Sequence, residues 1–396
     1  MIFSTVSVLT SLISATTVLA GPARMDNIQA RAVTGVTGSA PGFATGTTGG
    51  GSAAPAYPSS RDQLVQWLQD STPRVILINS EQNFIGTEGT TTAKGCRPDS
   101  NTCPGAGGQD AINLANWCTN GNAGPGVTTV DVTYDNAALN PIKVGSNKSL
   151  VGVGANASFK GKGLRLAGAQ NVIIQNVHIH TLNPQYIWGG DGITLDGSDN
   201  VWVDHVKVSL VGRQMFVAGV GANKRVALTN SELDGRTSWS ATCNGKHYWA
   251  IYTTGSNDRI TMSGNYIHET SGRGPKVGGQ GDTVLHVVNN YWSNVVGHAF
   301  DVETGGRTVI EGNVFENVQT PALNAGSSFV ATSSNGASCS SYLGRVCQAN
   351  TLTGSGSIAG TSTSAFAAFS GFSVAPATSA SSVKANVLAN AGVGKI

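Results

Sequence analysis

The sequence is poor in charge: charged residues make up 12% of its 396 residues, against about 25% in ordinary soluble domains. Lys and Arg total 24 and Asp and Glu total 22, so the formal net charge is +2. The basic residues form neither a cluster that would neutralise a row of phosphates nor a basic amphipathic stripe. The composition therefore excludes nucleic acid and a membrane surface as partners.

Long hydrophobic runs are also missing. After the first residues no segment approaches the roughly 20 apolar residues that span a bilayer. Hydrophobic residues nevertheless make up 40% of the chain, which excludes a disordered protein, and there are 52 glycines. A surface built from Ser, Thr, Asn and Gly suits an extracellular all-β protein with many turns.

The N-terminus indicates secretion. Residues 1–20 carry no charge and end in the small-residue site Val18-Leu19-Ala20, as a cleaved signal peptide does. A membrane anchor is the alternative, but Ser and Thr dilute this segment. Residues 21–31 are a candidate pro-segment, because Arg31 offers a processing site. We expect a secreted, extracellular protein whose residues 32–396 form one domain.

Cysteine usage and two sequons agree with secretion. The chain has six cysteines and no Cys-x-x-Cys pair, so three disulfides are favoured over a zinc site. Six cysteines allow 15 pairings, of which Cys339 with Cys347 is the easiest because it closes a short loop. Asn147 and Asn156 begin Asn-x-Ser glycosylation motifs.

A repeat of 23 to 35 residues runs through the middle of the chain. Each copy has a β-branched strand, a polar corner and a second short strand. The Asn-Gly turns of propellers and sandwiches are scarce. Asn tolerates a left-handed corner, and its amide can bond its copy on the next coil. The pattern predicts a right-handed parallel β-helix with an asparagine ladder, whose corners are Asn176, His205, Asn230, Asn265, Asn290 and Asn313.

Such a stack needs covered ends. Ser60-Arg-Asp-Gln63 is a capping box that opens an amphipathic helix, followed by the strand 75–78. We expect this helix to cap the N-terminal end and the helical stretch 382–391 to close the other. Long loops between the coils, 235–249 above all, are expected to form a functional cleft.

Charged residues beside coil strands are the candidates for chemistry. Arg273 and Lys276 flank a Gly-Pro turn, and Arg213 follows a coil strand. Asp191 lies between glycines that let backbone and ligand approach closely. The alternative for each is structural: a solvated turn for the cations and a turn cap for the carboxylate.

Aromatic residues gather in loops and at strand ends, and four of six lie within residues 239–252. Indole and phenol rings stack on sugar faces and keep one polar edge, whereas burial under the loops is the alternative. The predicted saccharide cleft is lined by Trp117, Trp188, Trp239, Tyr248, Trp249 and Tyr252.

Several motifs carry a family resemblance. Besides the Asn-cornered coils they are Val201-Trp-Val-Asp-His205, Gly212-Arg-Gln214, Ser271-Gly-Arg-Gly-Pro-Lys-Val277, Asn289-Asn-Tyr-Trp292 and Thr48-Gly-Gly-Gly-Ser-Ala53. From about Val33 to the end, the sequence resembles fungal pectin lyases of polysaccharide lyase family 1. Met215 departs from the expected pattern, in which His follows Gly-Arg-Gln.

The resemblance implies a lyase that cleaves methyl-esterified pectin by β-elimination, with no cofactor and no metal. An open cleft on a solenoid favours endo action, and we expect a monomer. It implies that Arg273 abstracts the proton, that Asp191 and Arg213 flank it and that Lys276 is a second cation. It also implies the disulfides Cys96–Cys118, Cys103–Cys243 and Cys339–Cys347. Guanidinium is essentially always protonated in water, so neighbouring cations and a dry cleft must favour its neutral form.

Three other functions compete. A pectate lyase would hold calcium with several carboxylates, but Asp196 and Asp199 after Asp191 form no dense acidic cluster, and Arg213 stands where another carboxylate would be useful. A hydrolase would need paired carboxylates, and no Asp-Asp pair occurs. A non-catalytic pectin-binding solenoid would use the aromatic cleft alone.

Overall fold

The computed structural model describes Met1 and residues 35–396, and its main compact unit spans Val33–Ile396. The predicted signal peptide and pro-segment, residues 1–20 and 21–31, lie outside the described residues except for Met1. In the described part of the chain, no helix is long and apolar enough to cross a membrane.

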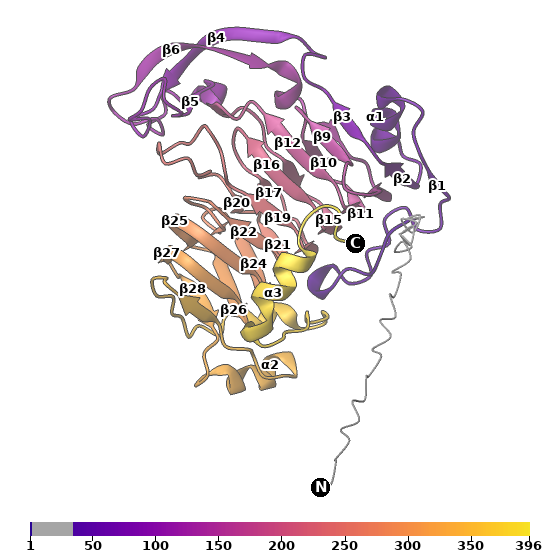
Figure 1. The fold of residues 1–396 in the computed structure, drawn as a ribbon, viewed down its shortest axis with the longest axis vertical. Helices are drawn as coiled ribbons and strands as arrows, with labels where there is room; N and C mark the ends of the chain where they lie inside the picture. The colour runs from indigo at the N-terminus through magenta and orange to yellow at the C-terminus, as the bar shows by residue number, and fades with distance from the viewer. Residues whose placement is uncertain (2–34) are drawn as a thin grey trace. The chain divides into compact units, whose positions relative to one another are not determined.

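Parallel strands on successive coils stack into a β-helix, as Figure 1 shows. What we call the first face is a sheet of ten strands. In order these are β1 (Pro55–Ala56), β2 (Arg74–Ile78), β8 (Lys148–Gly152), β11 (Gln170–Gln175), β15 (Asp199–Asp204), β18 (Val226–Thr229), β21 (Asn257–Ser263), β24 (Asp282–Val288), β26 (Gly306–Glu311) and β28 (Ser327–Val330).

Two further faces belong to one sheet of 15 strands. The second face is β3 (Glu81–Asn83), β9 (Ser158–Lys160), β12 (His178–Leu182), β16 (Lys207–Val211), β19 (Glu232–Asp234) and β22 (Tyr266–His268). The third face is β7 (Ile142–Lys143), β10 (Leu164–Ala167), β14 (Ile193–Asp196), β17 (Phe216–Ala218), β20 (Ile251–Thr253) and β23 (Lys276–Val277). Long strands β25 (Tyr291–Val302) and β27 (Val314–Asn324) join the two faces, and β29 (Thr351–Thr353) pairs with β27.

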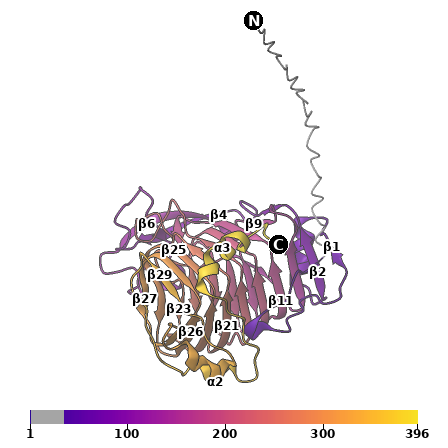
Figure 2. The same cartoon turned by 60° about the horizontal axis from the view of Figure 1, so that its bottom comes forward.

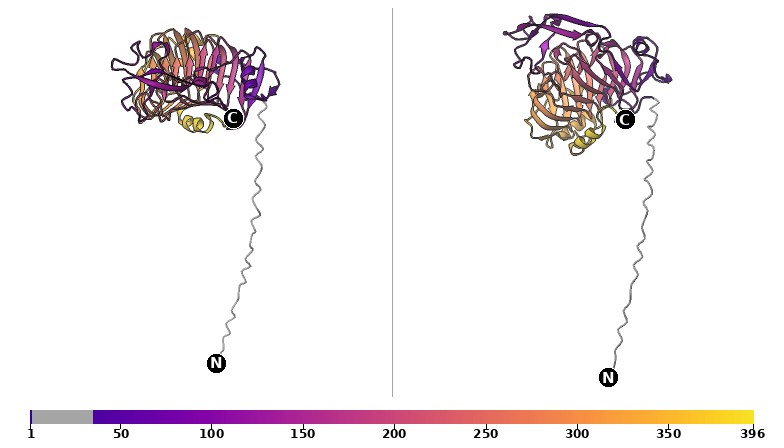
Figure 3. Two further views of the ribbon diagram at one scale, coloured as in Figure 1. Left: turned by 90° about the horizontal axis from the view of Figure 1, so that it is seen from above. Right: turned by 45° about the horizontal axis from the view of Figure 1, so that its top comes forward.

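A small separate sheet lies at the margin of the stacked coils (Figure 3). It pairs β4 (Thr90–Arg97) antiparallel with β6 (Thr128–Asp135) and with β5 (Asp110–Ala111), which in turn pairs with β13 (Tyr186–Ile187). The helices are α1 (Arg61–Gln69), α2 (Ser340–Leu343) and α3 (Ala380–Asn390), with short 3-10 turns at Gly42–Ala44, Leu114–Asn116, Asn136–Leu139, Gly336–Cys339 and Phe366–Phe369.

The interior is a stack of aliphatic side chains, one from each coil of the first face. Their partners in register are themselves apolar, so every coil covers the one before it and buries its own side chain. The stack is Ile76, Leu150, Ile174, Val203, Leu228, Met262, Val287 and Ile310, each at most 2% exposed.

The corner residues form two neighbouring columns, which corrects the predicted single ladder. The Asn265 side-chain amide donates to Asn290 Oδ1 at 2.8 Å, Asn290 donates to Asn313 at 3.0 Å, and Asn313 donates to Asn350 at 2.9 Å.

The predicted corners 176, 205 and 230 instead lie one position earlier in their coils, at positive φ. Ser231 takes the ladder position beside Asn265, and its backbone N–H donates to Asn265 Oδ1. The asparagine ladder therefore occupies only the later coils.

The N-terminal helix begins at the predicted N-cap Ser60, but Gln63 bonds the residue before the cap instead of the cap itself. Ser60 Oγ accepts from the backbone N–H of Gln63 at 3.1 Å, and the Gln63 side chain accepts from the Ser59 N–H at 2.6 Å. Leu64 and Leu68 are fully buried in the main core. Helix α1 lies against β2 and β7 at the start of the stack.

The C-terminal helix lies elsewhere than predicted. Instead of closing the last coil, α3 packs along the second-face side of β25 and β27 (Figure 2). Val383 and Val387 contact Tyr291 and Val314 there. This helix therefore covers the side of the β-helix and not its end, because its apolar residues pack against the outward Tyr and Val side chains of those strands.

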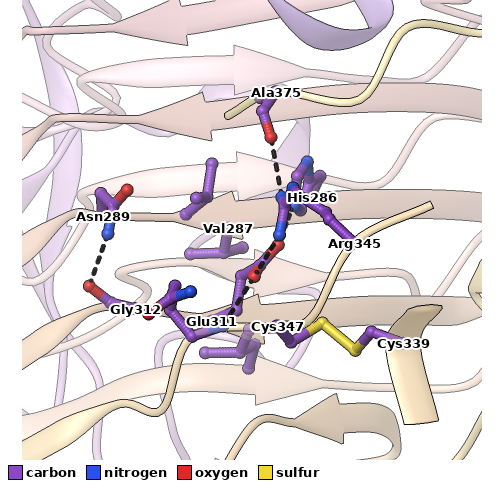
Figure 4. A network of polar contacts seen from close by, with 12 residues as sticks. His286, Val287, Asn289, Glu311, Gly312, Cys339, Arg345, Cys347 and Ala375 are labelled. Atoms are coloured by element: carbon purple, nitrogen blue, oxygen red, sulfur yellow. Dashed lines mark hydrogen bonds and ion pairs between the residues drawn. A yellow bond between two sulfur atoms is a disulfide. The ribbon is translucent and has the colours of Figure 1, made fainter. Parts of the chain in front are cut away.

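A buried charge network fastens the C-terminal segment to the outer side of the first face (Figure 4). The fully buried Glu311 carboxylate accepts from His286 Nε2 at 2.8 Å and from Arg345 Nη2 at 2.7 Å. Arg345 also donates to the carbonyl of Ala375 at 2.8 Å. The network joins two strands to two separate stretches of the covering segment.

Candidate active site

The outward side chains of the third face form a row, to which each coil contributes one residue. Neighbouring strands lie about 4.8 Å apart, so the row advances by that distance at each coil. A polymer laid across the strands would meet its members in succession. This outer row consists of Lys143, Arg165, Thr194, Val217, Tyr252, Lys276 and Asp301.

Loops entering the third face bring together the predicted catalytic residues. Asp191, Arg213 and Arg273 precede β14, β17 and β23 by two or three residues each. Only β20 lies between β17 and β23, and its own entry loop supplies Tyr248 and Trp249. Residues that are far apart in sequence therefore stand beside the same stretch of the outer row.

The Arg273 guanidinium lies among aromatic rings. Its Cζ is 4.7 Å from the ring centre of Trp249, 5.1 Å from that of Tyr252 and 5.8 Å from that of Tyr248. The Arg273 backbone has φ of 46°, in the left-handed region that a residue other than glycine seldom adopts. Among the ion pairs formed by the described residues, none includes Arg273. Its charge is therefore available to a bound ligand.

Arg213 and Asp191 form a partly buried pair. Arg213 Nη1 lies 3.7 Å from Asp191 Oδ2, and the guanidinium stacks 3.6 Å above the ring of Trp188. Asp191 Oδ1 accepts from the backbone N–H of Gln214 at 2.8 Å. Burial lowers the pKa of Arg213, which Asp191 partly offsets and the charge of Arg273 reinforces. Burial likewise raises the pKa of Asp191 against the opposing charge of Arg213.

Lys276 differs from the two arginines because carboxylates already hold it. Its Nζ lies 2.6 Å from Glu303 Oε1 and 3.5 Å from Asp301 Oδ2. Burial acts to lower the pKa of Lys276, but the hydrogen bond that Lys276 donates to Glu303 and the charge of Asp301 raise it overall. Lys276 is thus a compensated cation at the edge of the site.

The six predicted cleft aromatics have different surroundings. Tyr248 and Tyr252 are partly exposed beside Arg273, and Trp188 lies under Arg213. Trp117 and Trp249 are each only 9% exposed and belong to the cluster that packs under the small sheet. The indole nitrogen of Trp249 donates to Gln109 at 3.1 Å. Trp239, at 37% exposure, stands on the loop surface.

Two of the three disulfides hold these loops beside the small sheet. The three bonds join Cys96 to Cys118, Cys103 to Cys243 and Cys339 to Cys347, the same pairs that the family resemblance implies. Cys103–Cys243 links the segment after β4 to the loop that precedes Tyr248 and Trp249. The covalent link limits how far this loop can move from the candidate site.

A family model described as pectate lyase matches residues 117–220 and 242–396. The chain belongs to the pectate lyase family. It is accordingly a polysaccharide lyase. Pectin lyase B of Emericella nidulans is 50% identical over 368 residues, covering 91% of this chain and 95% of that protein. The probable pectin lyase E of Aspergillus fumigatus is 51% identical over 377 residues, covering 91% of this chain and 96% of its own.

Solved pectate lyases share the fold of this family member. A pectate lyase from Bacillus sp. N165 in complex with trigalacturonate superposes with a TM-score of 0.54 at 19% identity, covering 89% of this chain and 98% of its own. A pectate lyase bound to a hexasaccharide gives a TM-score of 0.55 at 18% identity, covering 93% of this chain and 100% of its own. The predicted all-β parallel β-helix is confirmed.

Calcium is the ion to test in a pectate lyase family site. Calcium takes six to eight oxygen ligands, often several carboxylates together. Here three carboxylates already face arginines, and Asp301 and Glu303 face Lys276, which leaves no shared anionic cage, so the residues present do not fit calcium. The pairs are Asp191 with Arg213 at 3.7 Å, Asp196 with Arg165 at 2.8 Å and Asp199 with Arg225 at 2.7 Å.

A different grouping of possible metal ligands lies on the second face. In the part of the chain that the structure describes, Glu232, Asp234 and His268 are the one such group. Lys207 Nζ lies 3.0 Å from Glu232 and 3.2 Å from Asp234, so an ammonium group already balances these carboxylates. This group is structural and lies apart from the arginine site.

Two residues near the site were missed from the sequence. His298 Nε2 accepts a hydrogen bond from the backbone N–H of Arg273 at 3.2 Å. The side-chain amide of Gln109 donates to the carbonyls of Pro184 and Gly212, and its oxygen accepts a hydrogen bond from the Trp249 indole. His298 follows Arg273 by one coil, so coil spacing was the signal that could have found it, whereas nothing local marks Gln109.

Proposed function

We propose that this chain is a secreted, endo-acting pectin lyase that cleaves methyl-esterified polygalacturonan without calcium. The observation that carries the proposal is the arginine-centred site, in which the neighbouring carboxylates are already paired with arginines or with Lys276. Such a site offers a calcium-bridged uronate no ligands, but it can receive a neutral ester. The curated relatives at about half identity are named pectin lyases.

The reaction assigned to this site is a β-elimination. The hydrogen on carbon 5 of a methyl galacturonate unit is acidified by the adjacent ester carbonyl. Arg273 takes that proton, the electron pair forms the C4–C5 double bond, and the C4–O bond breaks. The departing oxygen takes up a proton from water and leaves as a new chain end, and Arg273 returns the proton from carbon 5 to water. Because a guanidinium has no acceptor, the proton transfer needs the neutral guanidine at that moment.

We assign to Arg213 the role of stabilising the negative charge that develops on the ester carbonyl oxygen. Its guanidinium is held by Asp191 on one side and by the Trp188 ring on the other. A cation fixed in place before the reaction stabilises an enolate without reorganising. Asp191 acts through Arg213 and is therefore a positioning residue, and Lys276 contributes charge at the edge of the site.

The middle of the outer row supports an esterified substrate. Thr194, Val217 and Tyr252 lie beside the two arginines, and all three are uncharged. A methyl ester set against these three side chains needs no counter-ion, because the surface that it contacts is uncharged. The row runs across several coils on the outer side of the third face, which suits internal attack on a polymer.

Secretion is supported by covalent features. All six cysteines are paired, as expected in an oxidising compartment. Of the two glycosylation candidates, Asn156 is exposed, whereas Asn147 is partly buried and its Oδ1 accepts from Asn171 at 3.0 Å. We propose that glycosylation occurs at Asn156 first. A monomeric state remains a prediction.

The decisive test is the ultraviolet absorbance of unsaturated uronides. The purified chain is given highly methylated pectin or polygalacturonate, each with EDTA or with added calcium. Absorbance that rises on methylated pectin despite EDTA supports the proposal. A rise restricted to polygalacturonate with calcium supports a pectate lyase instead, and binding of pectin without any rise supports a non-catalytic solenoid.

A further inference from the structure

One end of the outer row is cationic. Lys143 on β7 and Arg165 on β10 are direct partners in register, and their side chains point away from the buried Ile142 and Leu164. Adjacent members of the row are one strand spacing apart, about 4.8 Å. The two charges therefore stand side by side on consecutive coils, beyond the uncharged middle of the row.

The same end is hollowed. Arg165 lines a hollow of about 180 Å³ together with Trp188, Asp191 and Thr194. Lys143 lines a larger neighbouring hollow, and Pro141 borders both. The hollow at Arg165 is thus continuous with the arginine site, because Asp191 and Trp188 belong to both.

The donors of Arg165 are only partly used. Its Nη2 donates to Asp196 at 2.8 Å, which fixes the guanidinium, while the side chain remains 41% exposed. A guanidinium has five N–H donors in a planar fork that matches a carboxylate. Lys143 is exposed and takes part in none of the ion pairs found among residues 35–396. A fixed fork and a neighbouring uncompensated ammonium provide the chemistry that binds a carboxylate.

We propose that Lys143 and Arg165 form a subsite for the free carboxylate of an unesterified galacturonate unit. The inference rests on the proposed function, because the unit belongs to the same polymer chain that is cleaved near Arg273. The uncharged row members Thr194, Val217 and Tyr252 take esterified units, and the cationic end takes an acidic one. The enzyme therefore distinguishes pectins by the positions of their ester groups, and it prefers a partly esterified polymer.

The rival explanation is that Arg165 serves only to anchor Asp196. Asp196 Oδ1 accepts the backbone N–H of Gly221 at 3.1 Å, so this carboxylate does hold a neighbouring coil. A purely structural Arg165 would affect stability and would change the use of every substrate alike. Lys143 has no such structural partner, so its variant isolates the binding role.

The test compares Lys143→Gln, Arg165→Gln and the charge-retaining Arg165→Lys. KM is measured by uronide absorbance on fully methylated polygalacturonate and on the same polymer after partial removal of its esters. Each Gln variant should raise KM about tenfold on the partly esterified polymer only, since a hydrogen bond to a charged group is lost, and Arg165→Lys should recover part of the loss. Lys224→Gln, which removes an exposed cation outside the row, is the matched control.

A second measurement does not depend on turnover. Calorimetry with unesterified trigalacturonate should show binding by the parent chain and a loss of binding in both Gln variants. Unchanged trigalacturonate binding, or equal KM changes on both polymers, overturns the subsite. If the parent chain yields no unsaturated product from either polymer, the proposed function fails instead, and the calorimetry still decides the subsite.

Discussion

The backbone N–H of Arg273 donates a hydrogen bond to Nε2 of His298, 3.2 Å away on the next coil. The imidazole thereby holds the left-handed backbone of Arg273, whose φ is 46°. The Tyr248 ring packs edge-on against His298, with ring centres 5.8 Å apart. Only a neutral imidazole offers an acceptor, so this bond couples the position of Arg273 to the protonation of His298.

Replacing His298 should therefore change turnover and its pH profile together. Burial lowers the pKa of His298, aided by the charges of Arg273 and Lys276 and opposed by Asp301, so the bond persists into mildly acidic solution. We expect His298→Phe to lower kcat about tenfold with little change in KM, and to remove the loss of activity that protonation of His298 causes at acid pH. His180→Phe, on the second face, is the control. A parental pH profile in His298→Phe would refute the coupling.

The two arginines should be intolerant of lysine. Arg273→Lys and Arg213→Lys keep the charge but lose the planar fork and move the nitrogen. We expect kcat for methylated pectin to fall by a factor of about 100 or more in each, with the urea midpoint unchanged. Arg236→Lys, at a 65% exposed position paired with Asp234, should retain parental kcat. Near-parental turnover in Arg273→Lys would remove it from the catalytic role.

Glu311 should dominate the attachment of the C-terminal segment. Its partners His286 and Arg345 lower its pKa to about 2 despite burial, so it is charged at all ordinary pH values. Glu311→Gln leaves Arg345 without its counter-charge, and we expect a loss of about 3–5 kcal/mol in the free energy of unfolding. Asp282→Asn breaks the exposed pair with Arg307 and should cost less than about 1 kcal/mol. Equal effects in urea titrations would contradict the buried network.

Asp258 gives the stability a pH dependence of known sign. Its carboxylate accepts from the backbone N–H groups of Asn223 at 2.6 Å and Gly255 at 3.1 Å, yet burial raises its pKa to about 7. The folded chain thus holds this proton more tightly than the unfolded chain, where the pKa of the carboxyl is about 4. Its contribution to stability is present below about pH 4 and is lost as the pH rises through about 7.

Removing the Asp258 carboxyl should weaken the dependence of the unfolding free energy on pH. We expect Asp258→Asn to be less stable than the parent near pH 5 and to close the difference by up to about 1.4 kcal/mol per pH unit as the pH rises toward 7. Asp131→Asn, at an exposed position, should track the parent at every pH. A constant difference between Asp258→Asn and the parent, measured by urea unfolding across this range, would show that Asp258 does not titrate there.

The sequence predicted which segments form strands, but it did not predict how the residues of neighbouring coils align. β-branched runs such as those leading to Asn290 and Asn313 predicted the strands and the ladder correctly. Aligning on Asn230 placed that coil one residue out of step, because Asn also satisfies the left-handed corner beside the ladder position. A single residue type that suits two adjacent positions cannot fix register without the neighbouring coil.

The candidate site was predictable only in part for a related reason. Arg213 and Arg273 stand in recognisable motifs, so the sequence named them. Arg165 and Lys143 have no motif, and their significance comes from pairing across coils. The C-terminal helix was misplaced because its own sequence indicates helix formation but not which surface of the solenoid it covers.

The outer row places one substrate-facing residue on each coil, so positions along the bound polymer correspond to successive coils. Each turn of the chain contributes a single residue, so an extra turn inserted between Arg165 and Trp188 would shift the acidic-unit contact by one step and would retain Asp191, Arg213 and Arg273. Substrate pattern and chemistry can therefore diverge independently in evolution, the first by changes in coil number and the second by substitutions in two loops.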